Sequence, residues 1–250
     1  MRSNERVSSD KHADHSAQAS LVAQAGSRRE QTAQGKDPVA RRRKQRSELI
    51  MLNEGVPINP GLPPVDFAGG RSLRRKSEVA LRALCVMMTA IKADRMHQTM
   101  VLRVVRQYGL AASFSPGEKN FIRELEPTDN EKSQFALRYE AAWVLLWALG
   151  YVDHLDPPSA RCDADRAVEI MREHSTQSFI SDAQLRPIDQ LLDQADLAYR
   201  YHCTLTDIAA AEDTLPDNLN AAIVFERQHA FNWLVRYSDC GWDEATAGAD

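Results

Sequence analysis

Apolar residues along most of the chain recur three or four positions apart, which is the spacing of one face of an α-helix. Helix-start signals support this pattern, because Ser115 and Thr128 are each followed three residues later by a glutamate, as in a capping box. No segment alternates apolar and polar residues for long enough to suggest a strand. We therefore predict an all-α fold, a single globular bundle of seven or eight helices with no significant sheet. The predicted helices cover residues 37–52, 77–92, 96–108, a segment opening at 116, 128–149, 164–173, 187–211 and 216–237.

The first 36 residues differ from the rest because they contain almost no large apolar side chains. Such a segment cannot bury enough surface to offset the entropy lost on ordering, so we expect residues 1–36 to form a disordered basic tail. Residues 37–71 are predicted to form one helix and a proline-rich connector, since proline lacks the N–H group that a helix or a central strand requires. Residues 72–246 then form the helical core domain.

Charge is divided unevenly along the 250 residues. Residues 1–76 carry 15 Lys and Arg against 8 Asp and Glu, whereas residues 77–250 carry 16 against 27, so a net +7 precedes a net −11. An acidic body of this kind favours a basic partner. The four cysteines lie far apart, and the first thirty residues contain no apolar run typical of a signal peptide. We therefore expect a cytoplasmic protein with no disulfide framework, no structural zinc and no membrane segment.

Charged residues interrupt two strongly apolar helices. The segment 131–149 is apolar on every side of the helical wheel, which predicts a central helix, yet it contains Arg138 and Glu140. In the last predicted helix, Glu226 lies in the middle of the apolar stripe and Arg227 lies on its edge. Because an unpaired buried charge is costly, we expect Arg138 and Glu226 to form a buried salt bridge that fixes the register of two helices. A ligand- or substrate-binding role for the same pair is the alternative.

The longest predicted helix carries His202 on its buried face and an acidic stripe beside it. The stripe contains Asp189, Asp193 and Asp196, and we expect it to be a solvated face on which Asp196 pairs with Arg200 one turn later. A metal site at this stripe is the alternative. We expect His202 to be a hydrogen-bonded core histidine rather than a ligand.

Distinctive blocks of sequence lie at intervals along the chain: GVPIN at 55–59, LP at 62–63, SEVALRAL at 77–84, RYEAAWVLLWALG at 138–150, DLAYRYH at 196–202, ER at 226–227, NWL at 232–234 and WD at 242–243. Together they resemble the bacterial family catalogued as domain of unknown function 4272, over about residues 42–246. The resemblance implies a mostly helical domain, and it implies no particular activity, cofactor or substrate. The family tends to have tryptophan after the histidine, where this chain has Cys203. The recurring polar positions that it implies are Arg138, Glu140, Asp196, Arg200, His202, Glu226 and Arg227.

Motifs for common chemistries are absent from the sequence. There is no glycine-rich phosphate loop, no H-E-x-x-H pair and no G-x-S-x-G elbow, so we expect no cofactor and no metal.

Three classes of function stay open. The leading hypothesis is a non-enzymatic module that binds an unknown protein or small-molecule partner, as an immunity or accessory protein would. The alternative is a hydrolase-like enzyme with a Glu/Arg/His polar pocket, in which Glu140 or Glu226 is the general base. The second alternative is a nucleic-acid-associated protein that makes weak, non-specific phosphate contacts through its basic N-terminal arm. The basic run of this arm consists of Arg41, Arg42, Arg43 and Lys44.

Overall fold

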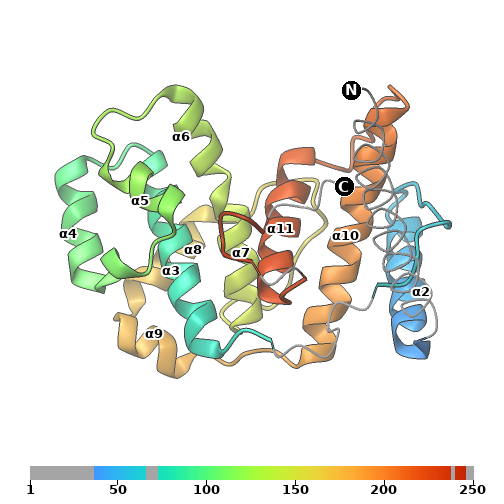
Figure 1. Cartoon of the computed structure of the whole chain (residues 1–250), viewed down its shortest axis with the longest axis horizontal. Helices are drawn as coiled ribbons and strands as arrows, with labels where there is room; N and C mark the ends of the chain where they lie inside the picture. The colour runs from blue at the N-terminus through green and yellow to red at the C-terminus, as the bar shows by residue number, and fades with distance from the viewer. Residues whose placement is uncertain (1–36, 66–72, 238–239, 246–250) are drawn as a thin grey trace, which may run out of the picture.

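The computed structural model describes residues 37–65, 73–237 and 240–245, and these segments form an all-α fold without a strand (Figure 1). The predicted fold class is thereby confirmed, whereas the predicted disordered tail at 1–36 lies outside the described residues. No helix in the described part of the chain is both long and apolar enough to span a bilayer. The helices are α2 (Pro38–Asn53), α3 (Lys76–Ala93), α4 (Gln98–Tyr108), the 3₁₀ helix η1 (Leu110–Ala112), α5 (Pro116–Arg123), α6 (Asp129–Ala136), α7 (Arg138–Ala148), α8 (Ala164–Glu173), α9 (Thr176–Asp182), α10 (Ile188–Ala210) and α11 (Ala221–Leu234).

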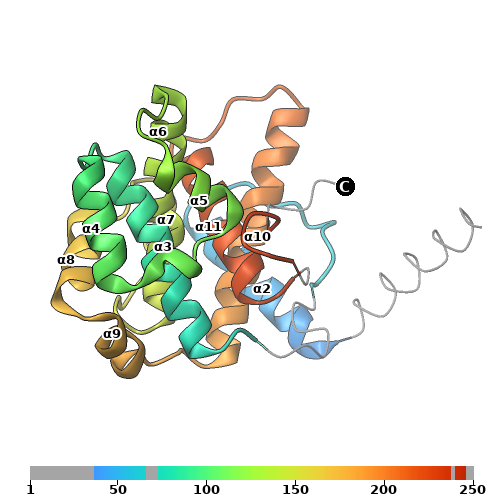
Figure 2. The same cartoon turned by 60° about the vertical axis from the view of Figure 1, so that its left-hand side comes forward.

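Helix α7 lies at the centre of the core, between α3 and α11 (Figures 1 and 2). Every residue of α7 from Tyr139 to Ala148 is buried, as its apolar wheel predicts. Helix α3 is enclosed in the same way, because it also packs against α4, α5, α6, α8 and α9. On the other side, α10 packs on α11 and α2 packs on α10. The order across the molecule is therefore α3, α7, α11, α10 and α2 (Figure 1).

Helix α2 and the proline-rich connector are docked on α10. The helix begins after Asp37, whose carboxylate caps its first backbone N–H groups, with proline in the first position. The connector then follows α10, where the Thr204 hydroxyl donates to the Pro57 carbonyl oxygen at 3.1 Å. An apolar cluster separate from the main core lies at this contact, and it consists of Met51, Val56, Leu197, Tyr201, Leu205, Leu219 and Val224.

Two predicted helices differ from those observed. The helix predicted over 128–149 is interrupted at Leu137, because the chain there passes from α6, which buries none of its residues, to the fully enclosed α7. The last helix begins at Ala221 and not at Pro216, since the Asn220 side chain caps it and Pro216 belongs to the preceding turn. The seven-residue α9 was not predicted, because it is too short to show an apolar period.

Lys92, near the end of α3, is buried and holds the end of α5. Its Nζ atom donates to the carbonyl oxygens of Phe121, Ile122 and Glu124 at 2.6, 3.0 and 2.5 Å. Carbonyl groups at a helix C-terminus lack partners within the helix and carry partial negative charge. Burial lowers the pKa of Lys92, while the nearby Glu124 and Glu131 oppose that shift. The ammonium group therefore acts as the C-terminal cap of α5.

We predict that Lys92→Met lowers the free energy of unfolding by about 2–3 kcal/mol, because methionine fills the space but leaves buried carbonyl groups without donors. Chemical denaturation at pH 7 measures the loss. The matched control is Lys132→Met, since Lys132 is 36% exposed and makes only a 3.4 Å contact with Asp129. This control should lose no more than about 0.5 kcal/mol. Equal losses in the two variants would contradict the capping role.

Candidate functional site

The seven polar residues singled out in the sequence form three ion pairs and leave one separate histidine. Two pairs join α7 to α11, and they are Arg138–Glu226 and Glu140–Arg227. The third pair, Asp196–Arg200, lies within α10. His202 contacts none of the three pairs through its ring and lies against Phe225 instead. The structure thus distributes these residues and does not gather them around one pocket.

The Glu140–Arg227 pair is buried, with 8% of the Arg227 side chain and 2% of the Glu140 side chain exposed. Both the Nε and the Nη2 atoms of Arg227 lie 3.1 Å from Oε2 of Glu140, and the Cys162 backbone N–H donates to Oε1 at 2.6 Å. The Nη1 atom of Arg227 also donates to the Asp156 carbonyl oxygen at 2.5 Å. Burial, and then the negative charge of Glu140, raise the pKa of the Cys162 thiol, which makes that thiol a poor nucleophile. Both carboxylate oxygens of Glu140 therefore have partners, and the loop between α7 and α8 is held to these helices at Asp156 and Cys162.

The Arg138–Glu226 pair confirms the predicted partnership, with 3.3 Å between Nη1 and Oε2. The pair is part-buried, since the two side chains keep 26% and 16% of their surface exposed. Burial raises the pKa of Glu226, and the Arg138 charge opposes that shift. This pair consequently lies at the edge of the core, where water still screens it.

The Asp196–Arg200 pair also exists as predicted, with hydrogen bonds of 2.8 and 3.0 Å. The predicted solvated face is observed at the exposed Asp189 but is wrong for the pair itself, because Asp196 is 0% and Arg200 1% exposed. Helix α2 covers this part of α10, where Arg43 bonds Asp193 at 3.2 Å, and the connector contributes the Pro63 carbonyl oxygen to Arg200 at 3.4 Å. A single helical wheel cannot reveal a covering helix that comes from 150 residues away in the sequence.

His202 is half-buried, and its ring makes an edge contact with Phe225, with 5.0 Å between ring centroids. No hydrogen bond to the ring occurs among the described residues, so the expected hydrogen-bonded core histidine is wrong. Burial lowers the pKa of His202. His202 therefore packs at the side of the interface between α10 and α11.

The basic run of α2 is partly turned inward. Arg43 is buried, and Lys44 donates to the carbonyl oxygens of Pro60 and Leu62 at 2.7 and 2.5 Å. Only Arg41 and Arg42 of the four predicted phosphate-contacting residues are exposed. In the described ranges no group of three or more His, Cys, Asp or Glu side chains is arranged to hold a metal ion.

Residues 240–245 form part of a second polar cluster, which was not predicted from the sequence. The Trp242 ring lies 5.3 Å from the Arg82 guanidinium carbon and 5.9 Å from that of Arg138, distances typical of cation–π contacts. Asp243 accepts the Ser115 hydroxyl hydrogen at 2.5 Å and the backbone N–H of the second residue of α5 at 2.8 Å. This segment therefore links α3, α5 and α7.

His229 of α11 packs under the same segment, with its ring 4.5 Å from the Trp242 ring. Its Nε2 atom is buried without a hydrogen-bond partner in the described part of the chain. Burial lowers the pKa of His229 to about 3, with Arg138 and Arg82 adding to the shift and Asp243 and the Trp242 backbone opposing it. The imidazole is therefore neutral at pH 7.

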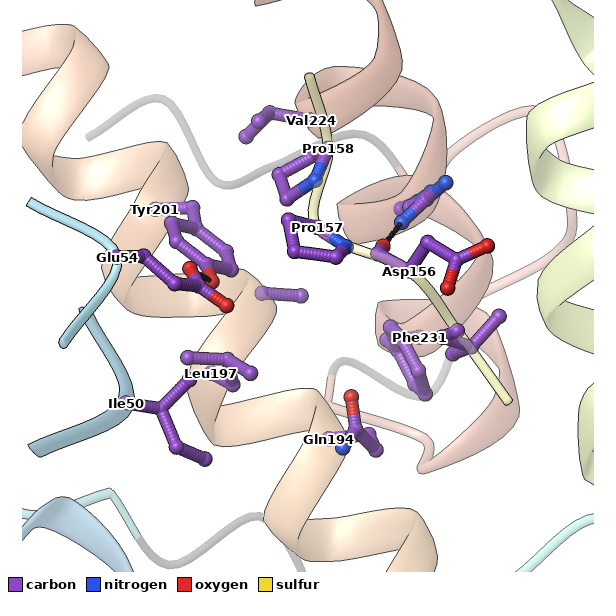
Figure 3. A pocket seen from close by; sticks show the side chains of 13 residues that line it. Ile50, Glu54, Asp156, Pro157, Pro158, Gln194, Leu197, Tyr201, Val224 and Phe231 are labelled. Atoms are coloured by element: carbon purple, nitrogen blue, oxygen red, sulfur yellow. Dashed lines mark hydrogen bonds between the residues drawn. The ribbon is translucent and has the colours of Figure 1, made fainter. Parts of the chain in front are cut away.

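A cleft of about 240 Å³ opens between α2, α10, α11 and the loop at 155–158 (Figure 3). Residues of α10 and α11 form two facing stripes, and Figure 3 places Tyr201 near Val224 at one end and Gln194 near Phe231 at the other. The end of α2 and two loop prolines close the remaining sides. The lining residues are Ile50, Glu54, Leu155, Asp156, Pro157, Pro158, Gln194, Leu197, Ala198, Tyr201, Val224, Arg227 and Phe231.

Few polar groups line this mostly apolar cleft. The Tyr201 hydroxyl donates to Oε2 of Glu54 across the gap between α10 and α2 (Figure 3). Burial, followed by the contact with Glu54, raises the pKa of Tyr201. Gln194 is half-buried, and its side-chain amide makes no hydrogen bond among the described residues. Asp156 and Arg227 also line the cleft, and Arg227 is the single member of the predicted polar set that does so.

Glu54, Gln194 and Tyr201 were missed by the sequence reasoning. The sequence does contain a signal for Gln194 and Tyr201. They lie seven residues, or two helical turns, apart on the α10 stripe that also carries Leu197 and Ala198. Glu54 has no such signal, since it lies 147 residues from Tyr201 and reaches it only through the fold.

Comparison with known proteins gives one match. The family model described as "Domain of unknown function (DUF4272)" matches residues 43–245, in agreement with the predicted resemblance. No curated protein and no solved structure matches the chain significantly.

We predict that removing the enclosed carboxylate is more damaging than removing the partly exposed one. Glu140→Ala leaves the Arg227 charge buried without its partner and should lower the free energy of unfolding by about 3–5 kcal/mol. Glu226→Ala should cost about 1–2 kcal/mol, because water screens its pair and burial already disfavours its ionised form. Urea denaturation at pH 7 compares the variants. A larger loss for Glu226→Ala would contradict this ranking.

We predict that His229 weakens the fold in mild acid. Its ordinary pKa of 6.5 applies to the unfolded chain and a pKa of about 3 to the folded chain, so below pH 6.5 the unfolded chain binds a proton that the folded chain excludes. The stability contributed by this residue is therefore complete above pH 6.5 and declines as the pH falls, by about 2 kcal/mol between pH 6.5 and 5. Denaturation curves across this range should show a steeper loss for the wild type than for His229→Gln. Parallel pH profiles would rule out the buried neutral imidazole as the cause.

Proposed function

The chain belongs to the DUF4272 family, which carries no assigned activity, and from the geometry of this member we propose that it is a non-enzymatic module that binds a small ligand in the α2–α10–α11 cleft. The cleft itself is the observation that carries the proposal. It combines apolar walls with a few polar groups, as small-molecule sites generally do. Its volume of about 240 Å³ suits a small metabolite.

The composition of the cleft supports binding over hydrolysis. Its described walls contain no histidine, cysteine, serine, threonine or lysine, so they lack the side chains on which most hydrolases rely, and the acid–base groups that they do contain are Glu54, Asp156 and Tyr201. Glu140 already accepts two hydrogen bonds and forms an ion pair with Arg227, and Glu226 pairs with Arg138 and does not line the cleft. These contacts disfavour both carboxylates as general bases.

The inward orientation of Arg43 and Lys44 favours the cleft over the basic arm as the binding site. Both side chains are engaged with protein atoms, which removes half of the cationic run from phosphate contact. Within the run at 41–44, the exposed Arg41 and Arg42 alone offer too few phosphate contacts for appreciable affinity at physiological salt.

We predict that a side chain placed inside the cleft abolishes ligand binding. Ala198→Phe should fill the cleft, because Ala198 lies on the α10 stripe between the two polar ends. A metabolite collection is screened by thermal denaturation against the wild type, and each compound that raises its melting temperature is titrated. Affinity for these compounds should fall at least tenfold in Ala198→Phe.

The matched control is Ala209→Phe, the same substitution at an exposed position of the same helix. This variant should bind the compounds as the wild type does. Equal affinities for the wild type and Ala198→Phe would place the ligand elsewhere and contradict the proposal.

A further inference from the structure

Glu54 is a carboxylate without a cationic partner at the mouth of an apolar cleft. The Tyr201 hydroxyl is the sole donor to it among the described residues, and no Lys or Arg in that part of the chain forms an ion pair with it. A hydroxyl group stabilises an ionised carboxylate but leaves its charge in place. The site therefore keeps a negative charge that a bound ligand can neutralise.

The position of Glu54 in the fold adds to this negative potential. Glu54 is the C-cap of the sixteen-residue α2, where the helix dipole places partial negative charge, and the last turn of α2 contains no basic residue. A cation at this point would be stabilised by the carboxylate and by the helix terminus together. A Lys, Arg or His side chain near a helix C-terminus can supply this compensation.

Arg227 does not cancel this charge. Its guanidinium group is already matched by Glu140, and its Nη1 atom is directed to the Asp156 carbonyl oxygen. The charges near the cleft therefore leave Glu54 uncompensated. Figure 3 shows the Asp156 carboxylate pointing away from Glu54 and Tyr201, so it neither repels nor replaces the Glu54 group.

The rest of the cleft sets the shape of the ligand. From Tyr201 the α10 stripe continues through Ala198 and Leu197 to Gln194, a distance of seven residues or about 10 Å along the helix. Aliphatic carbons and the Phe231 ring line that path. A ligand with its charge at Glu54 would thus lie with an apolar body along the stripe and reach the unbonded Gln194 amide at the far end.

From this arrangement we infer that the cleft binds a small organic amine, with its ammonium group at Glu54 and Tyr201 and its apolar chain along α10. The inference rests on the proposed function, because it names the class of ligand for the same cleft. A primary amine is protonated at pH 7, and its ammonium group donates three hydrogen bonds, to Glu54, to the Tyr201 oxygen and to water.

The test compares three six-carbon probes in NMR titrations of the full chain at pH 7: hexylammonium, 1-hexanol and hexanoate. The wild type should bind hexylammonium at least tenfold more tightly than hexanol, and hexanoate most weakly. Glu54→Gln keeps a partner for Tyr201 but removes the charge, so it should weaken hexylammonium about tenfold, the loss typical of a charged hydrogen bond, and leave hexanol unchanged. Glu48→Gln, the same substitution in α2 outside the cleft lining, should behave as the wild type.

A fourth probe, Nα-acetyl-lysine methylamide, separates a free amine from the lysine of a partner protein. Binding of this probe without binding of hexylammonium would overturn the assignment to a free amine. So would a failure of hexylammonium to bind, equal affinity of the wild type for hexylammonium and hexanol, or undiminished hexylammonium binding by Glu54→Gln. If hexylammonium fails in one of these ways while hexanol binds and Ala198→Phe abolishes the hexanol binding, the cleft is still the ligand site and only the amine is excluded. Probe binding that Ala198→Phe leaves unaltered would instead contradict the proposed function itself.

Discussion

The Glu140–Arg227 pair withdraws two charges from water between α7 and α11, and such a pair is tolerated only when its remaining hydrogen-bonding atoms also find partners. Those partners come from outside the two helices, namely the Cys162 backbone N–H and the Asp156 carbonyl oxygen. The pair thereby determines where the loop between α7 and α8 runs. Pro157 and Pro158 come directly after Asp156, whose carbonyl oxygen Arg227 holds, and they form one wall of the cleft. The geometry of the cleft therefore depends on the Glu140–Arg227 pair.

Much of the fold was predictable from sequence, because local signals and apolar periodicity agreed. Strong N-terminal caps at Ser115 and Thr128 are observed as capping boxes, and the long helix α10 ends within one residue of its predicted limit. Arg138 and Glu226 could be paired in advance, since each is a misfit on an apolar helix and only an opposite charge relieves the cost. Their depth was not predictable, because a wheel gives the direction of a side chain and not its distance from the surface.

The candidate site was largely beyond prediction, for a physical reason. Glu54 and Tyr201 lie 147 residues apart, and their contact depends on the docking of α2 against α10, which no local pattern encodes. The same docking explains why Asp196 was wrongly assigned to a solvated face, since Asp196 is solvated only on an isolated helix. Arg227 alone was singled out beforehand among the lining residues, because its charge conflicts with its apolar neighbours.

The segment at 240–245 has a consequence for how the chain reaches this fold. Asp243 caps α5 from 128 residues away, and Trp242 covers guanidinium groups from α3 and α7. Because the ribosome delivers the chain from its N-terminus, these earlier helices emerge long before the residues that complete them. Contacts between such distant positions slow folding, since a long loop must close before they form. The contacts of Trp242 and Asp243 therefore form only after synthesis has passed residue 243, so α3, α5 and α7 lack them while the rest of the chain is being made.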